Sequence, residues 1–193
     1  MGPSITATGS SVAWEGVRVT SAGRARTLLD QHRAIGFAVA VTVLVVDQAS
    51  KAWAVAALTG KAAVPVLGRF LTLRLIYNGG SAFSFGNRAT WIFTVIAAAA
   101  VVALTRWVWT AHTRLGALTL GLLLGGAVTH LLDRLLRAPG FGVGKVVDFI
   151  DYDEWFIGNV ADIALVTGSA ALGLLLFTGR ETLGGRTGSA ESR

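Results

Sequence analysis

The chain has 193 residues, of which 53% are hydrophobic and 15% are charged, and its mean hydropathy is +0.61. This composition is too apolar for an ordinary soluble domain and indicates one integral membrane bundle. The absence of cysteine excludes a disulfide, a thiol nucleophile and a thiolate metal site, and three scattered histidines make a zinc site unexpected, so we expect no metal or other cofactor. The net charge of +6 is spread along the chain, which favours membrane lipid over nucleic acid as a partner.

Residues 1–33 are polar and rich in Gly, Ser and Thr, and we expect them to form a flexible cytoplasmic tail. Arginines precede the first apolar run, so a cleaved signal peptide is the alternative. The first apolar run carries a polar motif at its far end and three more apolar runs follow, which favours the tail. Each run is close to the ~20 residues that a helix needs to cross a bilayer. The predicted spans are 34–54, 89–109, 115–136 and 156–177.

Four spans place both termini on the same side of the membrane. Lys and Arg are divided almost evenly between the two sides, but the arginines before the first span favour cytoplasmic termini. We therefore expect a four-helix membrane domain over residues 34–178 and a second cytoplasmic tail over residues 179–193.

Short strands are predicted between the first two spans, within residues 62–86. The segment AVPVLG is followed by FLTLRLIY, in which Leu and Tyr alternate with Thr and Arg, as in a half-buried strand. The glycine-rich segment NGGSAFSFG then indicates a turn. The predicted fold is thus an all-α integral membrane protein with four transmembrane helices and a small extracytoplasmic sheet between helices 1 and 2.

Three polar groups in these segments are candidates for a site. Asp47 and Lys51 are four residues apart, so they share a helix face and can pair. They either form an interfacial ion pair that ends the helix, or contact a lipid headgroup or support the site. Asn78 and Gly80 lie in a turn that either only closes a hairpin or binds a substrate segment. A third group is a stripe on one face of the third span, which should face the bundle interior and consists of Gly126, His130, Asp133, Arg134 and Arg137. Asp133 and Arg134 are either a structural ion pair with partners on other helices or part of the site.

Asp148 and Asp162 are the candidates for a catalytic pair. Asp148 lies in VVDF before the fourth span, and Asp162 lies inside that span with Asn159 one turn earlier. A carboxylate at membrane depth usually marks function. The alternative for Asp162 is an interhelical hydrogen bond, for example with Arg134. A loop before the helix would let Asp148 fold back over Asp162, and the acidic residues of that loop are expected to be solvated and without a role (Asp151, Asp153, Glu154).

Two aspartates suit a hydrolysis that uses no metal, serine or cysteine. One group must take a proton from water, and another must protonate the carbonyl or the leaving amine. Two close carboxyl groups cannot both ionise easily, so they share a proton and act together as base and acid.

Five motifs resemble, in the same order, those of the lipoprotein signal peptidases, the type II signal peptidases of bacteria. They are DQASK (47–51), NGGSAF (78–83), GGAVTHLLDR (125–134), VVDF (146–149) and GNVAD (158–162), and the resemblance covers residues 34–178. It implies an aspartyl endopeptidase of the bacterial inner membrane, which cuts prolipoproteins on the N-terminal side of a diacylglyceryl-modified cysteine. It also implies an active site near the extracytoplasmic face, with the strands forming a cradle there. Separately, we expect the protein to be a monomer.

The resemblance assigns roles by motif position. Asp148 and Asp162 match the catalytic aspartates, and the positions around the site are matched by Asp47, Lys51, Asn78, Arg134 and Asn159. The chain departs from the pattern where Thr129 and His130 replace Gly and Asn, and where Gly158 replaces Phe. Because a histidine titrates near neutral pH, we expect activity to depend more on pH.

Two other functions remain as alternatives. A small proton-coupled transporter or channel would use Asp133, Asp162 and His130 as a relay, but no internal repeat of the kind common in transporters is evident. A structural membrane subunit would use both aspartates for assembly rather than for turnover.

Overall fold

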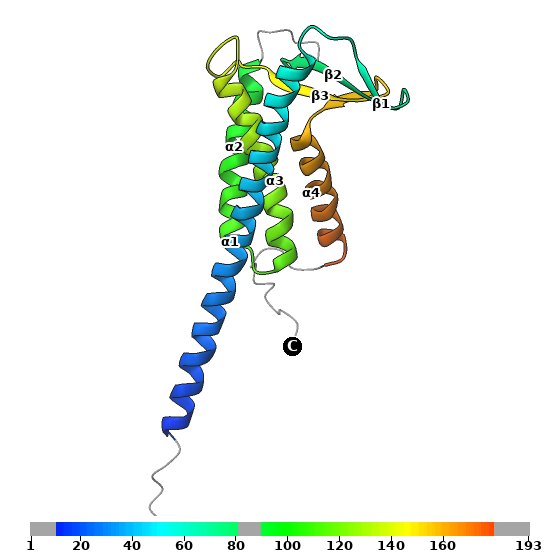
Figure 1. Ribbon diagram of the computed structural model, residues 1–193. Coiled ribbons are helices and arrows are strands. Elements are labelled where there is room, and N and C mark those ends of the chain that lie inside the picture. The colour runs from blue at the N-terminus through cyan, green and yellow to red at the C-terminus, as the bar shows by residue number, and fades with distance from the viewer. Residues whose placement is uncertain (1–10, 81–89, 180–193) are drawn as a thin grey trace, which may run out of the picture.

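The computed structural model describes residues 11–80 and 90–179, with side chains from residue 26 onward. Four helices run along one another and a small sheet covers one end of the bundle (Figure 1). The helices are α1 (Ser11–Leu58), α2 (Thr90–Trp109), α3 (Arg114–Leu136) and α4 (Val160–Phe177). Each contains a stretch that is long and apolar enough to cross a membrane, and in α1 this stretch begins at Arg26. The four predicted spans are therefore confirmed.

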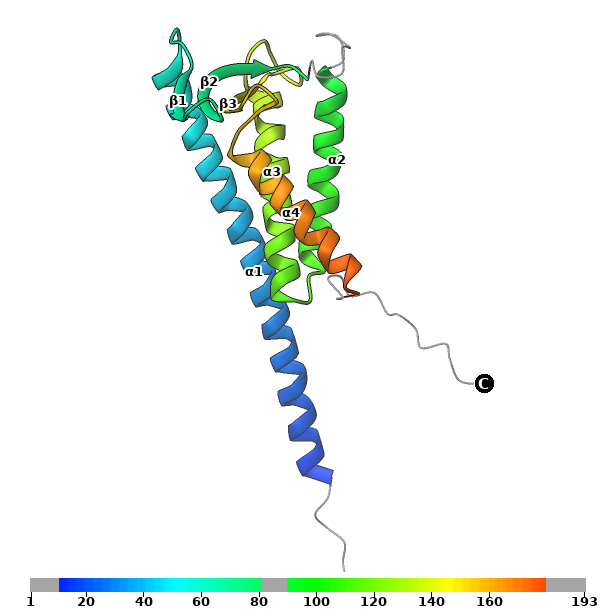
Figure 2. The same ribbon diagram turned by 90° about the vertical axis from the view of Figure 1, so that its right-hand side faces the viewer.

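Helix α1 is much longer than its predicted span and continues far beyond the other helices (Figure 2). The prediction of a flexible tail over residues 1–33 was wrong from Ser11 onward, while residues 1–10 lie outside the described part of the chain. Residues 11–33 contain no proline, and a helix that continues from a long apolar span needs no new nucleus. The chain therefore stays helical although its composition is polar.

Helix α3 lies at the centre of the bundle and is the most buried of the four. Two consecutive glycines let it approach helices on two sides. A Cβ at Gly125 would lie 2.7 Å from Cβ of Val43 on α1, and a Cβ at Gly126 would lie 2.6 Å from Cγ of Leu165 on α4. Small residues at such crossings allow close packing in a membrane, where helices gain no hydrophobic energy from meeting.

The sheet has four antiparallel strands in the order β1-β2-β3-β4. Strands β1 (Val64–Leu67) and β2 (Leu71–Asn78) lie between α1 and α2, as the alternating pattern predicted. Strands β3 (Val146–Tyr152) and β4 (Phe156–Gly158) form a hairpin between α3 and α4. That hairpin was missed, because VVDF was assigned to a loop and Phe156 to the fourth span. The run VVDFIDY is rich in β-branched and aromatic residues, which favour strands.

The sheet rests on the end of α1. Phe149 of β3 packs in an apolar cluster with Ala54 and Leu58. Its ring packs edge to face against the ring of Trp53, with 6.3 Å between the ring centroids. The sheet lies at the opposite end of the bundle from the start of α1 and the end of α4 (Figures 1 and 2). Both ends of the described chain thus lie on the same side, as four spans require.

Candidate active site

Asp148 is placed by the pairing of β2 with β3. It lies opposite Ile76 in the register, so Asn78, two residues further along β2, is its diagonal neighbour on the same face of the sheet. Asn78 Nδ2 donates to Asp148 Oδ2 at 3.0 Å. The backbone N–H of Gly80 donates to Asn78 Oδ1 at 2.8 Å, which fixes the orientation of the amide. Asn78 and Gly80 thus act together on Asp148, whereas Ser81, Ala82 and Phe83 of the same motif lie outside the described residues.

Asp162 is placed by the start of α4. The helix begins at Val160, so Asp162 lies in its first turn and not two turns inside, as the predicted span implied. Asn159 is the N-cap and forms a capping box, in which the Asn159 N–H donates to Asp162 Oδ2 at 2.9 Å and the Asp162 N–H donates to Asn159 Oδ1 at 3.2 Å. The preference of Asn for the N-cap explains why the helix starts here.

Asn159 also joins the two aspartates. Its Nδ2 donates to Asp148 Oδ1 at 2.6 Å, while its backbone N–H contacts Asp162. The β3–β4 hairpin brings the chain back beside Asp148 at the start of α4. Asp148 and Asp162, which are 14 residues apart in sequence, therefore share Asn159 as a hydrogen-bond partner. The two aspartates thus lie close together, as expected for a pair of carboxyl groups that act jointly. A β-hairpin, and not the expected loop, brings them together.

His130 and Arg134, from the polar stripe of α3, reach the same site. His130 Nε2 lies 3.2 Å from Asp162 Oδ1, so Asp162 meets His130 and not Arg134. Arg134 Nη1 donates to the carbonyl oxygens of Gly144 at 3.2 Å and Gly79 at 3.4 Å. Arg134 thereby ties two loops above the helices together. Asp133 and Arg134 were expected to have ion-pair partners on other helices. Asp133 has one, Lys51 of α1, whereas Arg134 forms no ion pair among the described residues.

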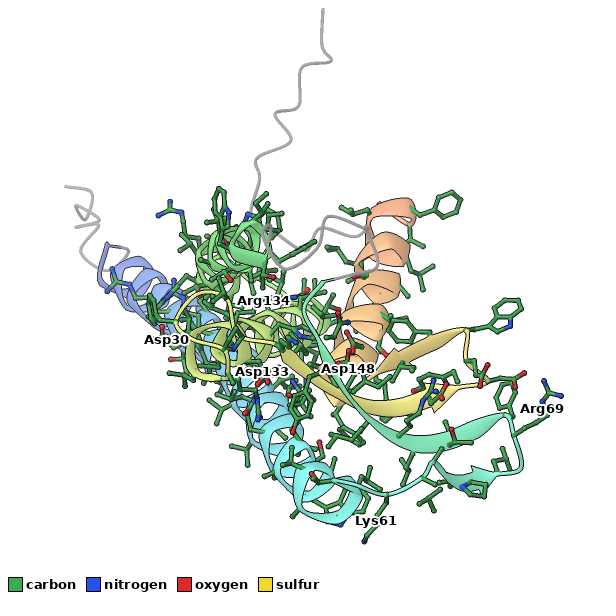
Figure 3. The ribbon with its side chains drawn as sticks, turned by 90° about the horizontal axis from the view of Figure 1, so that it is seen from above. Asp30, Lys61, Arg69, Asp133, Arg134 and Asp148 are labelled. Atoms are coloured by element: carbon green, nitrogen blue, oxygen red, sulfur yellow. The ribbon has the colours of Figure 1, made fainter. Side chains whose placement is uncertain are left out.

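A cavity of about 340 Å³ lies beside these groups. Its polar wall consists of Asn78, His130, Arg134, Asp148 and Asp162, and its apolar wall includes Phe93, Ile96, Ala97, Ala100, Ala127 and Leu165. Seen from the sheet end, Asp148 and Arg134 lie where the helices meet the strands, far from Lys61 and Arg69 at the edges (Figure 3). The two candidate aspartates thus open on one mostly apolar cavity.

The environment of Asp148 favours its protonated form. The pKa of Asp148 is raised to about 6, chiefly by burial and also by the negative charge of Asp162, while the hydrogen bonds from Asn78 and Asn159 and the nearby His130 act in the opposite direction. Within residues 26–80 and 90–179, neither Asp148 nor Asp162 forms an ion pair with a lysine or an arginine. Such a carboxyl group can exchange a proton near neutral pH, which general acid–base chemistry requires.

A second charged cluster lies next to the first, and its lysine and two carboxylates are closed to solvent. Lys51 Nζ lies 2.6 Å from Asp47 Oδ2 and 2.7 Å from Asp133 Oδ2, and the three side chains are at most 1% exposed. Arg137 Nε adds an ion pair with Asp133 Oδ1 at 2.7 Å. The i, i+4 pair of Asp47 and Lys51 was predicted, but the bridge from Lys51 to α3 was not. We call Asp47, Lys51, Asp133 and Arg137 the buried charge cluster.

The buried charge cluster holds the backbone next to each candidate aspartate. Asp47 Oδ1 accepts the N–H of Ala161 at 2.9 Å, one residue before Asp162. Asp133 Oδ2 accepts the N–H of Val147 at 3.4 Å, one residue before Asp148. Asp47 and Asp133 thus bond directly to the main chain beside the two candidate aspartates, and Lys51 links them to each other. The supporting role of the three residues stays a prediction.

Other polar contacts were missed or misjudged from the sequence. Gln48 was not chosen as a candidate, yet its Nε2 donates to Thr129 Oγ1 at 2.7 Å and to Asp133 Oδ1 at 2.9 Å. Asp151 was expected in a solvated loop, but it is buried and pairs with Arg74 at 3.0 Å. Its position in a strand, two residues after Phe149, was the signal that the sequence offered. Within the described residues no group of three His, Cys, Asp or Glu side chains is placed to hold a metal ion.

Comparison with known proteins decides the family. The model of the signal peptidase (SPase) II family matches residues 39–178, most of the chain. This chain belongs to the signal peptidase II family. A protein named lipoprotein signal peptidase from Streptomyces coelicolor is 42% identical over 154 residues, which cover 80% of this chain and 76% of the relative. One of the same name from Rhodococcus jostii is 40% identical over 158 residues, with 82% and 80% covered.

Solved structures agree with this membership. A bacterial membrane enzyme determined by the in meso method at 1.9 Å resolution superposes with a TM-score of 0.65 at 25% identity, over 73% of this chain and 91% of the other. The fold of this signal peptidase II family member, with its four helices and small sheet, is thus shared with a solved membrane enzyme.

Proposed function

We propose that this chain is a lipoprotein signal peptidase in which Asp148 and Asp162 are the catalytic pair. The family membership and the names of the relatives support removal of signal peptides from prolipoproteins. The observation that carries the catalytic assignment is the placement of two carboxyl groups, joined through Asn159 and without a Lys or Arg partner among the described residues, on one cavity. Neither the structure nor the comparisons favour the transporter or channel.

The proposed reaction needs one ionised and one protonated carboxyl group. The ionised group takes a proton from a water molecule, which attacks the scissile carbonyl carbon, while the protonated group donates to the carbonyl oxygen. The resulting gem-diol collapses when the first carboxyl group returns its proton to the leaving amine. The hydrogen bonds from Asn78 and Asn159 hold Asp148, and the capping box holds Asp162, so both groups are oriented before the substrate arrives.

The apolar wall of the cavity suits a lipid-bearing substrate. Phe93, Ile96 and Ala100 on α2 face Leu165 on α4 across the cavity. A second groove of about 290 Å³ runs along α4 from Asp162 past Ile163 and Val166. These surfaces would bind the signal helix and the acyl chains of a diacylglyceryl-modified prolipoprotein. They would also exclude bulk water from the scissile peptide bond, which precedes the modified cysteine.

The placement in the cell completes this proposal. We expect a monomer in the bacterial plasma membrane with both termini in the cytoplasm. The sheet end of the bundle, with Asp148 and Asp162, then lies near the extracytoplasmic face, where the substrate's modified cysteine is found. Arg26 and Arg33 at the opposite end of the spanning part of α1 agree with the bias of basic residues toward the cytoplasm.

The experiment that tests the proposal is cleavage of a diacylglyceryl-modified prolipoprotein in membranes that contain the enzyme. Asp148→Asn and Asp162→Asn should each reduce cleavage to background while the protein stays inserted and folded. Asp153→Asn is the matched control, because Asp153 lies in the same hairpin but pairs with exposed Arg69 at 3.1 Å. Full activity in either variant of the pair would end the catalytic assignment.

A further inference from the structure

The two carboxyl groups of the proposed pair have different kinds of partner. Both oxygens of Asp148 accept amide N–H donors, at 3.0 Å from Asn78 and at 2.6 Å from Asn159. The orientation of each amide is fixed, because the Oδ1 atoms of Asn78 and Asn159 accept backbone N–H groups from Gly80 and Asp162. Amide donors do not change their charge with pH, so Asp148 accepts the same two hydrogen bonds over the whole pH range.

Asp162 has one partner that can change its charge. Its Oδ2 accepts the backbone N–H of Asn159, but its Oδ1 lies 3.2 Å from Nε2 of His130. An imidazole nitrogen can donate or accept a hydrogen bond, and the ring can carry either one or two protons. Both side chains are partly exposed to the cavity, at 20% for His130 and 23% for Asp162, so a proton can reach them.

The charged groups that face His130 come from three elements. They are Asp162 on α4, Asp148 on β3 and Arg134 one turn further along α3, all of which line the same cavity. The side chains of α2 that line the cavity are apolar (Phe93, Ile96, Ala97, Ala100). Two acidic groups and one permanent cation therefore surround the ring, and only Asp162 is within hydrogen-bond distance of it among the described residues.

We propose that His130 is a positioning residue of this peptidase, which holds Asp162 by the Nε2–Oδ1 hydrogen bond and shares one proton with it. This inference rests on the proposed function. With Nδ1 protonated, the shared proton lies either on Asp162 Oδ1, beside a neutral ring, or on Nε2, beside an ionised carboxylate. No other atom moves between the two arrangements. The His130–Asp162 pair then stores the proton for the scissile carbonyl, and Asp148 is the base that activates water.

The proton count of the reaction closes with these roles. Water loses a proton to Asp148 as its oxygen bonds to the carbonyl carbon, and the carbonyl oxygen gains a proton from Asp162. When the C–N bond breaks, the amine takes the proton from Asp148 and one gem-diol hydroxyl returns its proton to Asp162.

The test uses the full-length enzyme in detergent and a diacylglyceryl-modified prolipopeptide, with kcat and KM measured from pH 5 to pH 9. In His130→Gln, which keeps a neutral polar side chain, kcat should fall on the order of 10- to 100-fold with little change in KM. The alkaline limb of the kcat profile should move to lower pH, because the imidazole no longer shares the proton. His130→Asn should move the limb in the same direction.

The matched control is His112→Gln, which removes an exposed imidazole from the α2–α3 connection and should leave the profile unchanged. A limb that stays in place in both His130 variants overturns the inference, whether or not the rate falls. Loss of folded protein in both variants would also overturn it, by giving His130 a purely structural role. If the wild-type enzyme cleaves, Asp148→Asn does not, and His130→Gln matches the wild type, only this inference fails. If the wild-type enzyme does not cleave, the proposed function itself fails.

Discussion

Asp47 and Asp133 share a lysine in the interior of the bundle, whereas Asp148 and Asp162 share an asparagine at the wall of a cavity. In the buried charge cluster, cations balance the carboxylates and no side chain of the lysine bridge is more than 1% exposed. At the cavity, the partners are amides and one imidazole. A carboxylate that is balanced by a close cation holds its charge and acts as scaffold, while one held only by neutral donors can exchange a proton. The difference in partner, more than the shared residue type, separates support from chemistry.

The largest expected effect comes from removing the cation of the buried charge cluster. Lys51→Met leaves Asp47 and Asp133 close together without their shared partner, and breaking a buried pair in this way typically destabilises a protein by about 3–5 kcal/mol. We expect a strong fall in the thermal unfolding midpoint in detergent, with loss of activity as a consequence. Lys61→Met, which removes an exposed lysine just after α1, is the control and should unfold as the wild type does. Equal midpoints for the two variants would contradict a structural role for the cluster.

Removing the charge of a carboxylate at the cavity should instead increase the stability of the folded protein. The pKa of Asp148 is raised to about 6 in the folded protein, so between pH 4 and pH 6 the folded state keeps a proton that the unfolded state has lost. The wild type should therefore lose stability as pH rises through 6, by up to about 3 kcal/mol. Asp148→Asn should lack this loss and be the more stable protein at pH 8, measured by chemical unfolding at pH 4.5 and pH 8. A wild-type stability that rises over this range would refute the prediction.

An intermediate effect is expected where α3 and α4 touch. In Gly126→Ala the new Cβ would lie 2.6 Å from Leu165 Cγ and 3.1 Å from the carbonyl oxygen of Ala161, so α4 must move. Overpacking of this kind costs about 1–3 kcal/mol, and a shift of Asp162 by ~1 Å can lower the rate on the order of 100-fold. Gly173→Ala, also in α4 but with no atom within 4 Å of the new Cβ, should keep full activity. Comparable activities for both variants would show that the contact does not position Asp162.

The smallest expected effect concerns the amide donors. Asn78→Ala removes the hydrogen bond to Asp148 Oδ2, which stabilises the ionised form, so the pKa of Asp148 should rise above its value of about 6. If Asp148 is the base, the acid limb of the kcat profile moves to higher pH while the alkaline limb stays. The measurement is the same pH series that tests His130. An acid limb that moves to lower pH would contradict the acceptor role of Asp148.

Much of this architecture could be predicted because membrane spans obey a simple length rule. The four apolar runs gave the four helices, and the alternation in FLTLRLIY gave β2. Asp162 could be chosen because a carboxylate is rare in an apolar helix, and Asp148 because it lies just before that helix in a motif that resembles the family's. The β3–β4 hairpin was not predicted, because its short strands lie directly against a helix start and look like part of the apolar run. Helix α1 was mistaken over residues 11–33, where a polar composition hid the continuation of a helix already begun.

Contacts across the bundle were beyond a single sequence for a different reason. Spacing along a helix predicts that Asp47 meets Lys51, but it does not say which residue of another helix reaches the same lysine. Nor does it distinguish His130 from Arg134 as the partner of Asp162, since both lie on one face of α3 and the choice depends on the depth at which α4 begins. Relative depth is set by packing, through contacts such as that of Gly126 with Leu165.

The bond from the N–H of Ala161 to Asp47 has a consequence for how the protein is made. It joins the last spanning helix to the first, so the reactive centre cannot be completed until synthesis has delivered α4 to the membrane. A nascent chain that has inserted only its first three helices already contains Asp47, Lys51 and Asp133, and can neutralise them against one another. With Asp148 and Asp162 as the proposed catalytic pair, we expect a nascent chain to stay inactive until α4, which carries Asp162, has entered the membrane.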